Sequence, residues 1–463
     1  MFDVNDSVLV IGVGRSGLAT AEVLRKRGIA VSAFDDKDPA ELDSERRKLE
    51  QIGVALLDRA ALDAAVRAST AAVLSPGVPL TNGAVQAVQA AGVPVYSEIE
   101  LAYRLSRAPI VAVTGSKGKS TTTALIGHLL RAAGRSVRVG GNIGNPLIRE
   151  TDAADERDIV VAEVSSFQLE SIRAFKPSVS VLLNISADHL DRYPSIDEYA
   201  EAKYRIFANQ GPGDAFVGNL DDANVARLRG TGARTIPCAA YWFSARGDPA
   251  ADALFADGAI ALRQPGAARA TALLEEADLR LVGRHNVANA LAATLAACLA
   301  GAPADALGKG LKTFAPLPHR LQVVATNGGV TWVDDSKASN PAAVISALES
   351  FERPIILIAG GKSKRTKFDA LGSVASQRAK AVVLIGETAR EIGGSVHSVP
   401  VHYADSMQAA VDAAAHLAAA GDVVLLSPGG SSFDMFESAE QRGDAFLKCV
   451  RSLERSSSGD RRA

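Results

Sequence analysis

Residues able to bind a nucleotide triphosphate lie in one short segment, 111–123, which reads Val-Ala-Val-Thr-Gly-Ser-Lys-Gly-Lys-Ser-Thr-Thr-Thr. Gly115 and Gly118 carry no side chain, so backbone N–H groups there can face a phosphate. Lys119 adds a positive charge, and the Ser120 hydroxyl can ligate Mg²⁺. The alanine- and leucine-rich stretch that follows predicts a helix, whose N-terminus favours an anion. The segment therefore predicts binding of a nucleotide triphosphate.

This loop is shorter than the usual phosphate-binding loop, because it reads G-x-x-G-K-S where G-x-x-x-x-G-K-[ST] is common. A glycine turn beside an unrelated lysine is the alternative interpretation. The apolar run before the loop and the threonines after it favour nucleotide binding.

A second glycine-rich turn, Gly12–Gly17, follows the apolar run 7–11. Asp35 and Asp36 come about 20 residues later, as in a dinucleotide-binding fingerprint. The motif alone is compatible with an NAD-dependent oxidoreductase, but related sheets use the same turn for other diphosphates. Ser75-Pro-Gly77 is another turn after a predicted strand, and an ordinary β–α loop explains it equally well.

The middle of the chain adds acidic groups. Glu163 ends the apolar run 159–164, where a carboxylate beside a phosphate loop can reach Mg²⁺. His189 lies in Asp188-His-Leu-Asp-Arg-Tyr193 after another predicted strand, and the neighbouring acids favour a functional role over a structural one. Lys203 lies in a predicted helix over 196–207, where pairing with Glu198 or Glu201 in solvent is the ordinary interpretation.

Two asparagines, Asn286 and Asn289, are three residues apart and share one helix face. They can read a purine edge or cap the helix. Further along, the cationic run 360–367 follows the predicted strand 355–359 and suits an anionic small molecule. The segments 334–341 and 427–434 have similar positions after predicted strands.

Apolar runs of strand length alternate with helical stretches, which predicts parallel sheets covered on both faces. The predicted strands are 7–12, 71–74, 110–113, 159–164, 179–184, 355–359, 381–385 and 423–426. We predict an α/β protein with three domains around one cleft: a Rossmann-like domain over 1–97, a central P-loop ATPase-like domain with a parallel sheet over 98–316, and a C-terminal Rossmann-like domain over 317–463. Residues 230–282 are predicted to form an antiparallel excursion, and the tail from about 455 is predicted to be disordered.

Composition excludes several classes of protein. The 463 residues are 47% hydrophobic with a net charge of −2, which gives no basic field for nucleic acid. Cys238, Cys298 and Cys449 are far apart, as is typical of a reducing cytoplasm. We find neither a secretion signal nor an apolar run long enough to span a membrane. A cytoplasmic monomer without membrane insertion is expected.

Taken in order, these motifs resemble those of the Mur ligases, most of all the branch that adds D-glutamate, and the resemblance covers nearly the whole chain. The specific segments are the short phosphate loop, Gly141-Asn-Ile-Gly144, Glu163-Val-Ser-Ser-Phe-Gln168, Asp188–Tyr193, Pro318-His-Arg320, Asp335-Ser-Lys-Ala-Ser-Asn340, Ser432-Phe-Asp434 and Gln441-Arg-Gly443. Three departures from the family pattern stand out. Lys117 is a lysine where asparagine is common, Ser339 replaces a frequent threonine, and Ala439 occupies a position that is often aromatic.

The resemblance implies ATP, two Mg²⁺ ions, UDP-N-acetylmuramoyl-L-alanine and glutamate as ligands, and an amide ligation through an acyl phosphate. It implies these catalytic residues: Lys119, Glu163, His189, Lys203 and Lys337. Implied ATP contacts are Gly115, Ser116, Lys117, Gly118, Lys119, Ser120, Thr121, Asn286, Asn289, Arg320, Asp335 and Lys337. Implied contacts to the UDP-linked substrate are Gly14, Arg15, Ser16, Asp36, Ser75, Gly77, Asn142, Ser165, Gln168 and His189. Implied glutamate contacts are Ser339, Lys364, Ser432 and Phe433. Implied metal ligands are Ser120, Glu163, His189 and Lys203, with Lys203 carbamylated.

Other functions stay open at this point. The same chemistry with L-glutamate, or a folylpolyglutamate-type ligase, differs only in the substrate. An NAD-dependent oxidoreductase leaves the phosphate loop and the acidic residues without a role. A regulator that merely binds ATP is the fourth possibility.

Overall fold

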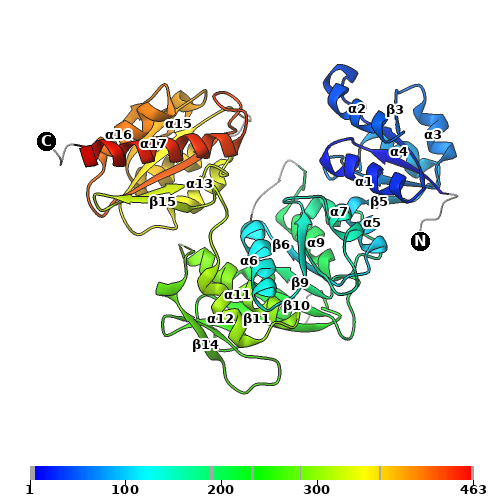
Figure 1. The fold of residues 1–463 in the computed structure, drawn as a ribbon, viewed down its shortest axis with the longest axis horizontal. Helices are drawn as coiled ribbons and strands as arrows, with labels where there is room; N and C mark the ends of the chain where they lie inside the picture. Colours follow the sequence, from blue (N-terminus) through cyan, green and yellow to red (C-terminus); the bar gives the residue numbers. More distant parts are fainter. Residues whose placement is uncertain (1–5, 187–191, 231–233, 282, 364–366, 460–463) are drawn as a thin grey trace. The chain divides into compact units, whose positions relative to one another are not determined.

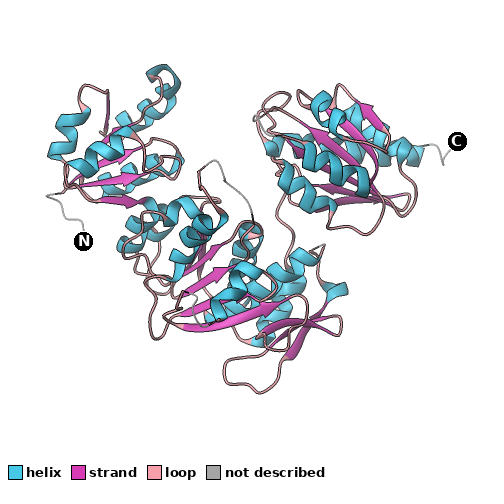
Figure 2. Cartoon of the chain, turned by 180° about the vertical axis from the view of Figure 1, so that it is seen from behind, coloured by secondary structure: helices cyan, strands magenta, loops and turns pink. Residues whose placement is uncertain are grey.

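A computed structural model describes residues 6–186, 192–230, 234–281, 283–363 and 367–459 (Figure 1). The chain divides into two compact units. The first combines Met1–Leu279 with His285–Phe314, and the second combines Arg280–Arg284 with Ala315–Ala463. Both units are built from alternating strands and helices (Figure 2).

The first unit begins with a five-stranded parallel sheet in the order β3-β2-β1-β4-β5. Its strands are β1 (Ser7–Ile11), β2 (Ala30–Phe34), β3 (Ala55–Leu57), β4 (Ala71–Leu74) and β5 (Val95–Ser97). Its helices are α1 (Arg15–Lys26), α2 (Asp43–Gln51), α3 (Leu62–Ala68) and α4 (Gly83–Ala90), with a 3₁₀ turn at Pro39–Leu42. The chain moves from β1 outward to β2 and then returns to the other side of β1 as β4. Ligands of open α/β sheets bind at such a reversal of strand order.

The same unit contains a nine-stranded sheet in the order β14-β13-β12-β11-β10-β9-β6-β8-β7. Its strands are β6 (Ile110–Thr114), β7 (Val137–Gly141), β8 (Ile159–Glu163), β9 (Val179–Leu182), β10 (Ala215–Asn219), β11 (Ala239–Ser244), β12 (Ala253–Ala256), β13 (Ala259–Leu262) and β14 (Thr271–Glu275). Its helices are α5 (Glu98–Leu105), α6 (Lys119–Ala132), α7 (Leu147–Asp152), α8 (Ser166–Leu169), α9 (Ile196–Tyr204), α10 (Ala223–Ala226), α11 (Arg284–Leu299) and α12 (Ala304–Thr313), with 3₁₀ turns at Arg205–Phe207, Arg227–Arg229 and Glu276–Asp278. β6 and β8 are buried along their whole length, as expected of strands covered on both faces.

The prediction of an antiparallel excursion over 230–282 is only partly right. β12, β13 and β14 do pair antiparallel. β11, however, pairs parallel with both β10 and β12. The segment between β10 and β11 contains α10 and a 3₁₀ turn, which supplies the crossover that a parallel pair requires.

The second unit contains a six-stranded sheet in the order β15-β16-β20-β17-β18-β19. β15 pairs antiparallel with β16, and the other pairs are parallel. Its strands are β15 (Gln322–Asn327), β16 (Val330–Asp334), β17 (Ile355–Gly360), β18 (Ala379–Ile385), β19 (Val401–Tyr403) and β20 (Val423–Gly429). Its helices are α13 (Pro341–Leu348), α14 (Asp369–Arg378), α15 (Ala389–Ser395), α16 (Met407–Leu417) and α17 (Ala439–Gly459).

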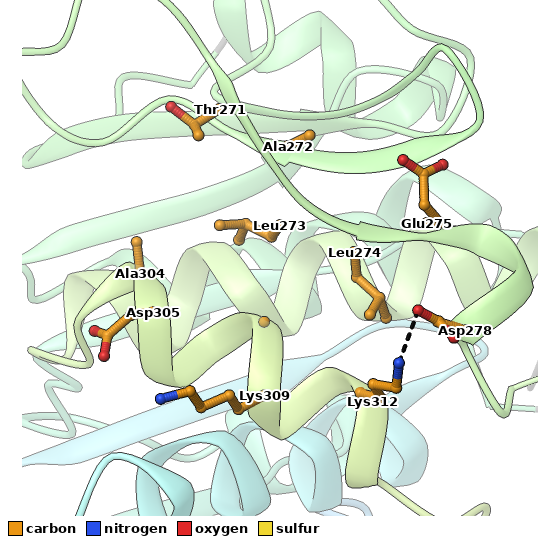
Figure 3. Close-up of a pocket in the computed structure, with 11 residues that line it drawn as sticks. Thr271, Ala272, Leu273, Leu274, Glu275, Asp278, Ala304, Asp305, Lys309 and Lys312 are labelled. Atoms are coloured by element: carbon orange, nitrogen blue, oxygen red, sulfur yellow. Dashed lines mark hydrogen bonds and ion pairs between the residues drawn. The ribbon is translucent and has the colours of Figure 1, made fainter.

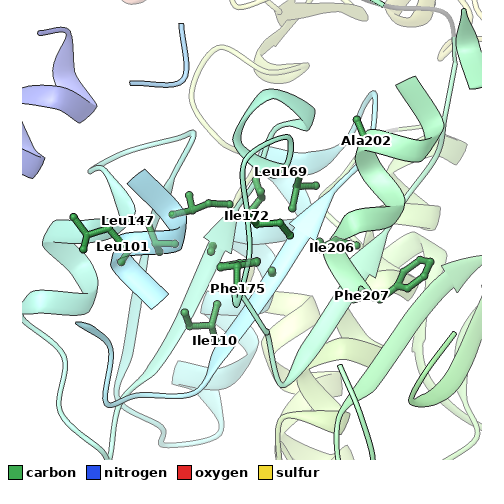
Figure 4. Close-up of a cluster of buried hydrophobic side chains, with 14 of the residues drawn as sticks. Leu101, Ile110, Leu147, Leu169, Ile172, Phe175, Ala202, Ile206 and Phe207 are labelled. Carbon is green, nitrogen blue, oxygen red and sulfur yellow. The ribbon is translucent and has the colours of Figure 1, made fainter. Parts of the chain in front are cut away.

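One hydrophobic core joins the first two sheets. It includes Val23 of α1, Leu101 of α5, Ile148 of α7 and Phe207, all nearly inaccessible to solvent. Figure 4 shows Leu101 and Phe207 of this cluster. Asp152 adds ion pairs across the same junction, because its carboxylate contacts Lys26, the last residue of α1, and Arg27, the next residue, at 2.9 and 2.8 Å. The first sheet is therefore fastened to the second by both apolar and ionic contacts.

The three sheets confirm the predicted three-domain α/β class. All predicted strands are present; the one over 71–74 has the predicted ends, and the others differ at one or both ends. The exact domain boundaries stay a prediction. α17 continues to Gly459, past the residue where a disordered tail is predicted, since adding residues to a formed helix costs little. Among the described residues, none of the helices has the length and apolar character needed to cross a membrane.

Candidate active site

The strand–loop–helix motif predicted from the sequence is present between β6 and α6. β6 ends at Thr114 and α6 begins at Lys119. Gly115 and Gly118 have φ values of +157° and +83°, which residues with a Cβ atom rarely adopt. Both glycines are thus needed for the loop to turn back over the end of the strand.

Asn289 of α11 lies directly against this loop. A Cβ atom on Gly118 would sit 2.2 Å from the Oδ1 atom of Asn289. The Asn289 side chain is itself held, because its Nδ2 donates to Oδ1 of Asn286 at 3.0 Å. The two asparagines predicted to face adenine therefore share a helix face, as expected, and Asn289 contacts the phosphate loop.

Polar side chains fix the rest of the loop. Lys119 Nζ donates to the carbonyl oxygens of Gly115 and Ser116 at 2.9 and 3.0 Å. Asn184, at the end of the neighbouring strand, accepts from Lys117 N at 2.8 Å and donates to Lys117 O at 3.1 Å. The loop is thus held in shape by the protein itself, and the Lys119 ammonium is placed over it.

Glu163 ends β8, the strand beside β6, and is buried. Its Oε1 accepts from Asn142 Nδ2 at 2.7 Å. Its Oε2 is buried without a hydrogen-bond partner among the described residues. A buried carboxylate oxygen left in this way is costly unless a cation or a donor occupies the adjacent space. Glu163 therefore fits a Mg²⁺ ligand, together with the buried Ser120 at the start of α6.

Lys203 is buried rather than solvated. Its side chain is 1% exposed, its Nζ donates to the carbonyl oxygen of Gly115 at 2.9 Å, and the ammonium lies 4.4 Å from the centre of the Tyr199 ring. Glu201, one of the acids proposed to pair with it in solvent, instead pairs with Arg234. The ordinary interpretation of Lys203 is therefore wrong, and the residue belongs to the phosphate loop. The Tyr199 hydroxyl reaches the same loop through Ser116 Oγ at 3.3 Å.

The turn after β1 uses one of the two aspartates for its own structure. Asp35 accepts from Val13 N at 2.8 Å and from Lys37 N at 3.1 Å. Asp36 is more exposed and contacts Arg59 Nη1 at 3.2 Å and Asn82 Nδ2 at 2.5 Å. Asp36 is thus better placed than Asp35 to meet a ribose or a base.

The remaining first-sheet residues lie around the same turn. Gly14 precedes α1, which starts with Arg15 and Ser16. Ser75 follows β4, the neighbour of β1, and its side chain lies against Gly12 and Gly14. The predicted contacts of the UDP group are therefore gathered at the carboxyl ends of β1 and β4. Gly77 lies two residues beyond Ser75 in the same turn.

Ser165 and Gln168 form a capping box at the start of α8. Gln168 Oε1 accepts from Ser165 N at 2.9 Å, and Gln168 N donates to Ser165 Oγ at 3.3 Å. The two predicted substrate contacts are thus hydrogen-bonded to each other.

The second unit gathers the other predicted residues at the ends of β16 and β20. Asp335 is buried and accepts from Ser427 Oγ at 2.9 Å and Leu321 N at 3.3 Å. Burial raises the pKa of this carboxyl to about 7. Lys337 forms an ion pair with Glu440 of α17. Ser432 is buried after β20, whereas the Phe433 side chain is 67% exposed beside it.

Arg442 was missed by the sequence analysis as a single residue, although its motif was noted. It is buried, and it donates to Ser336 Oγ at 3.0 Å, Ser336 O at 2.9 Å and Gly430 O at 3.2 Å. The guanidinium thus ties together the two loops that carry Lys337, Ser339 and Ser432. The next residue, Gly443, packs against His319, because a Cβ atom on Gly443 would lie 2.1 Å from His319 Nδ1.

Some predicted residues are not placed. His189 and Lys364 lie outside the described residues, and so do Asp188 and Asp191 of the same motif as His189. The phosphate loop belongs to the first unit. The second unit contains the predicted site residues Arg320, Lys337, Ser339, Ser432 and Phe433. In the described part of the chain, no cluster of three or more acidic, histidine or cysteine side chains suits a metal ion.

A groove of about 650 Å³ between β14 and α12 contains none of the predicted site residues (Figure 3). Lys312 and Asp278 face each other across it at 3.0 Å, and Leu273 and Leu274 line its strand side. It has no glycine-rich turn or buried carboxylate, so it is separate from the candidate active site.

Comparison with known proteins agrees with these features. A family model described as the Mur ligase middle domain matches residues 113–297, one described as the Mur ligase, glutamate ligase domain matches 319–430, and one described as the Mur ligase MurD-like, N-terminal domain matches 6–97. Proteins named UDP-N-acetylmuramoylalanine–D-glutamate ligase are similar over nearly the whole chain. The one from Pelotomaculum thermopropionicum is 44% identical over 97% of this chain and 98% of its own length, and the one from Salinibacter ruber is 43% identical over 96% and 97%.

The chain belongs to the Mur ligase family. Solved structures with the same fold include a pseudomurein peptide ligase type C from Methanothermus fervidus, with a TM-score of 0.59, 18% identity and coverage of 97% of this chain and 100% of that one. MurF from Thermotoga maritima in complex with ADP also has a TM-score of 0.59 at 18% identity, covering 98% and 100%. The family membership that the sequence motifs predict is thus confirmed.

Proposed function

We propose that this Mur ligase is an ATP-dependent enzyme that joins D-glutamate to UDP-N-acetylmuramoyl-L-alanine in peptidoglycan synthesis. The observation that carries the proposal is full-length similarity to ligases of that name, at 44% and 42% identity, combined with the MurD-like model over the first sheet. The phosphate loop supports the use of ATP independently of the relatives.

The chemistry requires activation of a carboxylate. A carboxylate is a poor electrophile, and transfer of the γ-phosphoryl group of ATP to it gives an acyl phosphate with a good leaving group. The amine of glutamate then attacks the acyl carbon, the C–N bond forms, and inorganic phosphate leaves. Positioning and charge stabilisation are the main tasks of the protein in such a transfer.

Lys119 is the phosphate-binding cation in this proposal. In the described structure its ammonium is held by the loop carbonyls of Gly115 and Ser116. Exchange of these neutral acceptors for phosphate oxygens gives stronger, charge-assisted hydrogen bonds. The backbone N–H groups at the start of α6, including that of Thr121, complete an anion-binding site.

Ser120 and Glu163 are the residues that would hold Mg²⁺. The unpartnered Oε2 of Glu163 favours this assignment, and Asn142 fixes the other oxygen of the same carboxylate. When bound, the metal offsets the charge of the transferred phosphoryl group. We place His189 beside these ligands from the family resemblance alone.

Lys203 is proposed to be carbamylated, and the carbamate would supply a further anionic ligand for Mg²⁺. Its burial against the phosphate loop supports the proposal, because a carbamate formed on Nζ would lie beside the loop proposed to hold the ATP phosphates. A carbamate retains one N–H group, so the hydrogen bond to Gly115 O is compatible with the modification.

Substrate contacts divide between the two units. In the first, Arg15, Asp36 and Ser75 would meet the UDP group, and Asn142 with the Ser165–Gln168 capping box would meet the sugar and peptide part. In the second, Arg320, Asp335 and Lys337 would complete the ATP site, and Ser339, Lys364, Ser432 and Phe433 would hold glutamate. Asn286 and Asn289 would face the adenine side.

We also propose that the enzyme acts as a monomer in the cytoplasm.

The test is an assay of ADP formation with ATP, Mg²⁺, UDP-N-acetylmuramoyl-L-alanine and either D- or L-glutamate. We expect ADP only when all components are present and only with the D-isomer, with an amide product of matching mass. Equal rates with L-glutamate would instead favour the alternative acceptor, and ADP formation without any glutamate would reject the ligase assignment.

A further inference from the structure

A cluster of side chains beside the capping box of α8 has no role in the proposed mechanism. Its centre is Glu170, which follows α8 directly. Glu170 Oε1 accepts from Arg192 Nε at 3.1 Å and from the Tyr193 hydroxyl at 2.5 Å. Its other oxygen, Oε2, accepts from Arg192 Nη2. One carboxylate therefore holds a guanidinium through a bidentate ion pair and a phenol through a further hydrogen bond.

This cluster is largely shielded from water. The side chains of Arg192 and Glu170 are 20% and 16% exposed, and Tyr193 is buried. Burial and the Glu170 carboxylate raise the pKa of Tyr193, so its phenol keeps the proton that it donates. A bidentate pair of this kind has a defined geometry, which an exposed ion pair with a single contact lacks.

Both held side chains pack on Phe167. The guanidinium carbon of Arg192 lies 4.1 Å from the centre of the Phe167 ring. The Tyr193 ring stacks on the same ring, with the two centres 6.0 Å apart. Phe167 is part of α8, which has four residues and begins at the Ser165–Gln168 capping box. A helix this short gains little stability from its own backbone, so its orientation depends on such side-chain contacts.

The same side chains line a small cavity beside the first sheet. Phe167, Gln168, Glu170 and Arg192 contribute to its lining together with Ser75 of the turn after β4. The cavity measures about 10 Å³, which is room for about one water molecule. The cluster around Glu170 thus adjoins two residues, Ser75 and Gln168, that are proposed to contact the UDP-linked substrate.

We infer that Glu170 is a positioning residue for the UDP-linked substrate. By holding Arg192 and Tyr193 on the Phe167 ring, its carboxylate fixes the orientation of the α8 capping box. The inference rests on the proposed function, because the capping box contacts the substrate only under that proposal. Glu170 itself is given no contact with the substrate or with the reacting atoms.

Glu170→Gln keeps the length of the side chain and removes its charge. An amide has one acceptor oxygen, so it cannot accept from both Nε and Nη2 of Arg192. We expect KM for the UDP-linked substrate to rise about tenfold, the low end of the cost of one hydrogen bond to a charged group. KM for ATP and kcat should change less than about threefold, because Lys119 and Asn184 still hold the phosphate loop.

Tyr193→Phe separates the hydroxyl from the ring. This variant keeps the ring that stacks on Phe167 and leaves the bidentate pair between Glu170 and Arg192 intact. Its KM for the UDP-linked substrate should therefore lie between those of the wild type and Glu170→Gln.

A double variant separates positioning from packing. In Glu170→Gln/Arg192→Gln both partners are neutral amides that can still bond to each other. If Glu170 acts through Arg192, the KM defect of the double variant should be smaller than the product of the two single defects.

The matched control is Glu100→Gln, which breaks a cluster of the same chemistry. Glu100 is buried and its Oε1 accepts from Arg104 Nε at 2.7 Å, while the Arg104 guanidinium lies 4.8 Å from the centre of the Tyr96 ring. The described lining of the cavity beside Ser75 includes neither Glu100 nor Arg104. This variant should lower the unfolding temperature without changing KM for the UDP-linked substrate.

Steady-state kinetics with each substrate varied in turn, and thermal unfolding of every variant, decide the outcome. Glu170→Gln with wild-type KM for the UDP-linked substrate, or multiplicative defects in the double variant, would overturn the inference and leave the ligase assignment intact. An equal rise of KM in Glu100→Gln would also overturn it, because lost stability would then be the cause. If Glu170→Gln does not fold, Arg192→Gln alone provides the test, and a wild-type KM there has the same consequence. A wild-type enzyme without glutamate-dependent ADP formation would instead remove the proposed function, and the inference with it.

Discussion

The contact between Gly118 and Asn289 makes the phosphate loop sensitive to a single methyl group. Gly118→Ala introduces a Cβ atom 2.2 Å from Asn289 Oδ1 at a residue whose φ is +83°. The left-handed backbone alone costs about 1–2 kcal/mol for a residue with a Cβ. Moving Asn289 away also breaks its buried hydrogen bond to Asn286, which costs about 1–3 kcal/mol more.

Gly134→Ala provides a matched control. Gly134 follows α6 with a φ of +77°, and a Cβ there would meet nothing within 4 Å. It therefore carries the backbone cost without the clash and lies outside the proposed ATP site. Gly134→Ala should lose about 1–2 kcal/mol of unfolding free energy and bind ATP normally.

Gly118→Ala should lose about 2–5 kcal/mol and bind ATP at least about tenfold more weakly, a change of about 1.4 kcal/mol. Denaturant unfolding and calorimetric titration with a non-hydrolysable ATP analogue measure the two quantities. Normal affinity of Gly118→Ala for the ATP analogue would show that the phosphate loop tolerates a Cβ atom against Asn289, and would contradict this prediction.

Three further predictions concern the buried charged groups. Lys203→Ala should lose most activity, with no rescue by bicarbonate and partial rescue by a short carboxylate such as formate, measured as ADP formation; wild-type rates would exclude the carbamate. Glu163→Gln should raise the Mg²⁺ concentration for half-maximal rate at least about tenfold, because a neutral amide is a weaker ligand for a hard cation; an unchanged magnesium titration would remove Glu163 from the metal site. Burial raises the pKa of Asp335 from 3.8 to about 7, so between these pH values the folded chain retains a proton that the unfolded chain releases. The contribution of Asp335 to the free energy of unfolding therefore falls as the pH rises from about 4 to about 7, by at most about 4 kcal/mol. Asp335→Asn should reduce that pH dependence in denaturant unfolding at pH 5 and pH 8, and parallel curves for variant and wild type would contradict it.

Local patterns in the sequence were sufficient for the fold and for the phosphate loop. Buried parallel strands are continuous apolar runs, so β6, β8, β17 and β20 stand out without any structure. The phosphate loop needs φ values that residues with a Cβ atom rarely adopt, so its glycines are visible in the sequence at the positions that need them. The antiparallel prediction for β11 was wrong because strand pairing depends on the crossover and not on composition.

Contacts between distant segments could not be predicted in the same way. Nothing in the sequence near Gly118 indicates that Asn289 packs on it, and the helix pattern around Lys203 is compatible with solvent. The role of Lys203 was inferred from the family resemblance alone, and its burial against the loop supports that inference. Arg442 was missed as a single residue because the role of an arginine depends on the buried groups that surround it.

The proposed ligation requires activation of the substrate carboxylate by the γ-phosphoryl group of ATP. The direct measurement uses UDP-N-acetylmuramoyl-L-alanine with heavy oxygen in its terminal carboxylate, incubated with the enzyme, ATP, Mg²⁺ and D-glutamate. If an acyl phosphate forms, each inorganic phosphate released should carry one heavy oxygen from that carboxylate. Amide formation with unlabelled phosphate would contradict it.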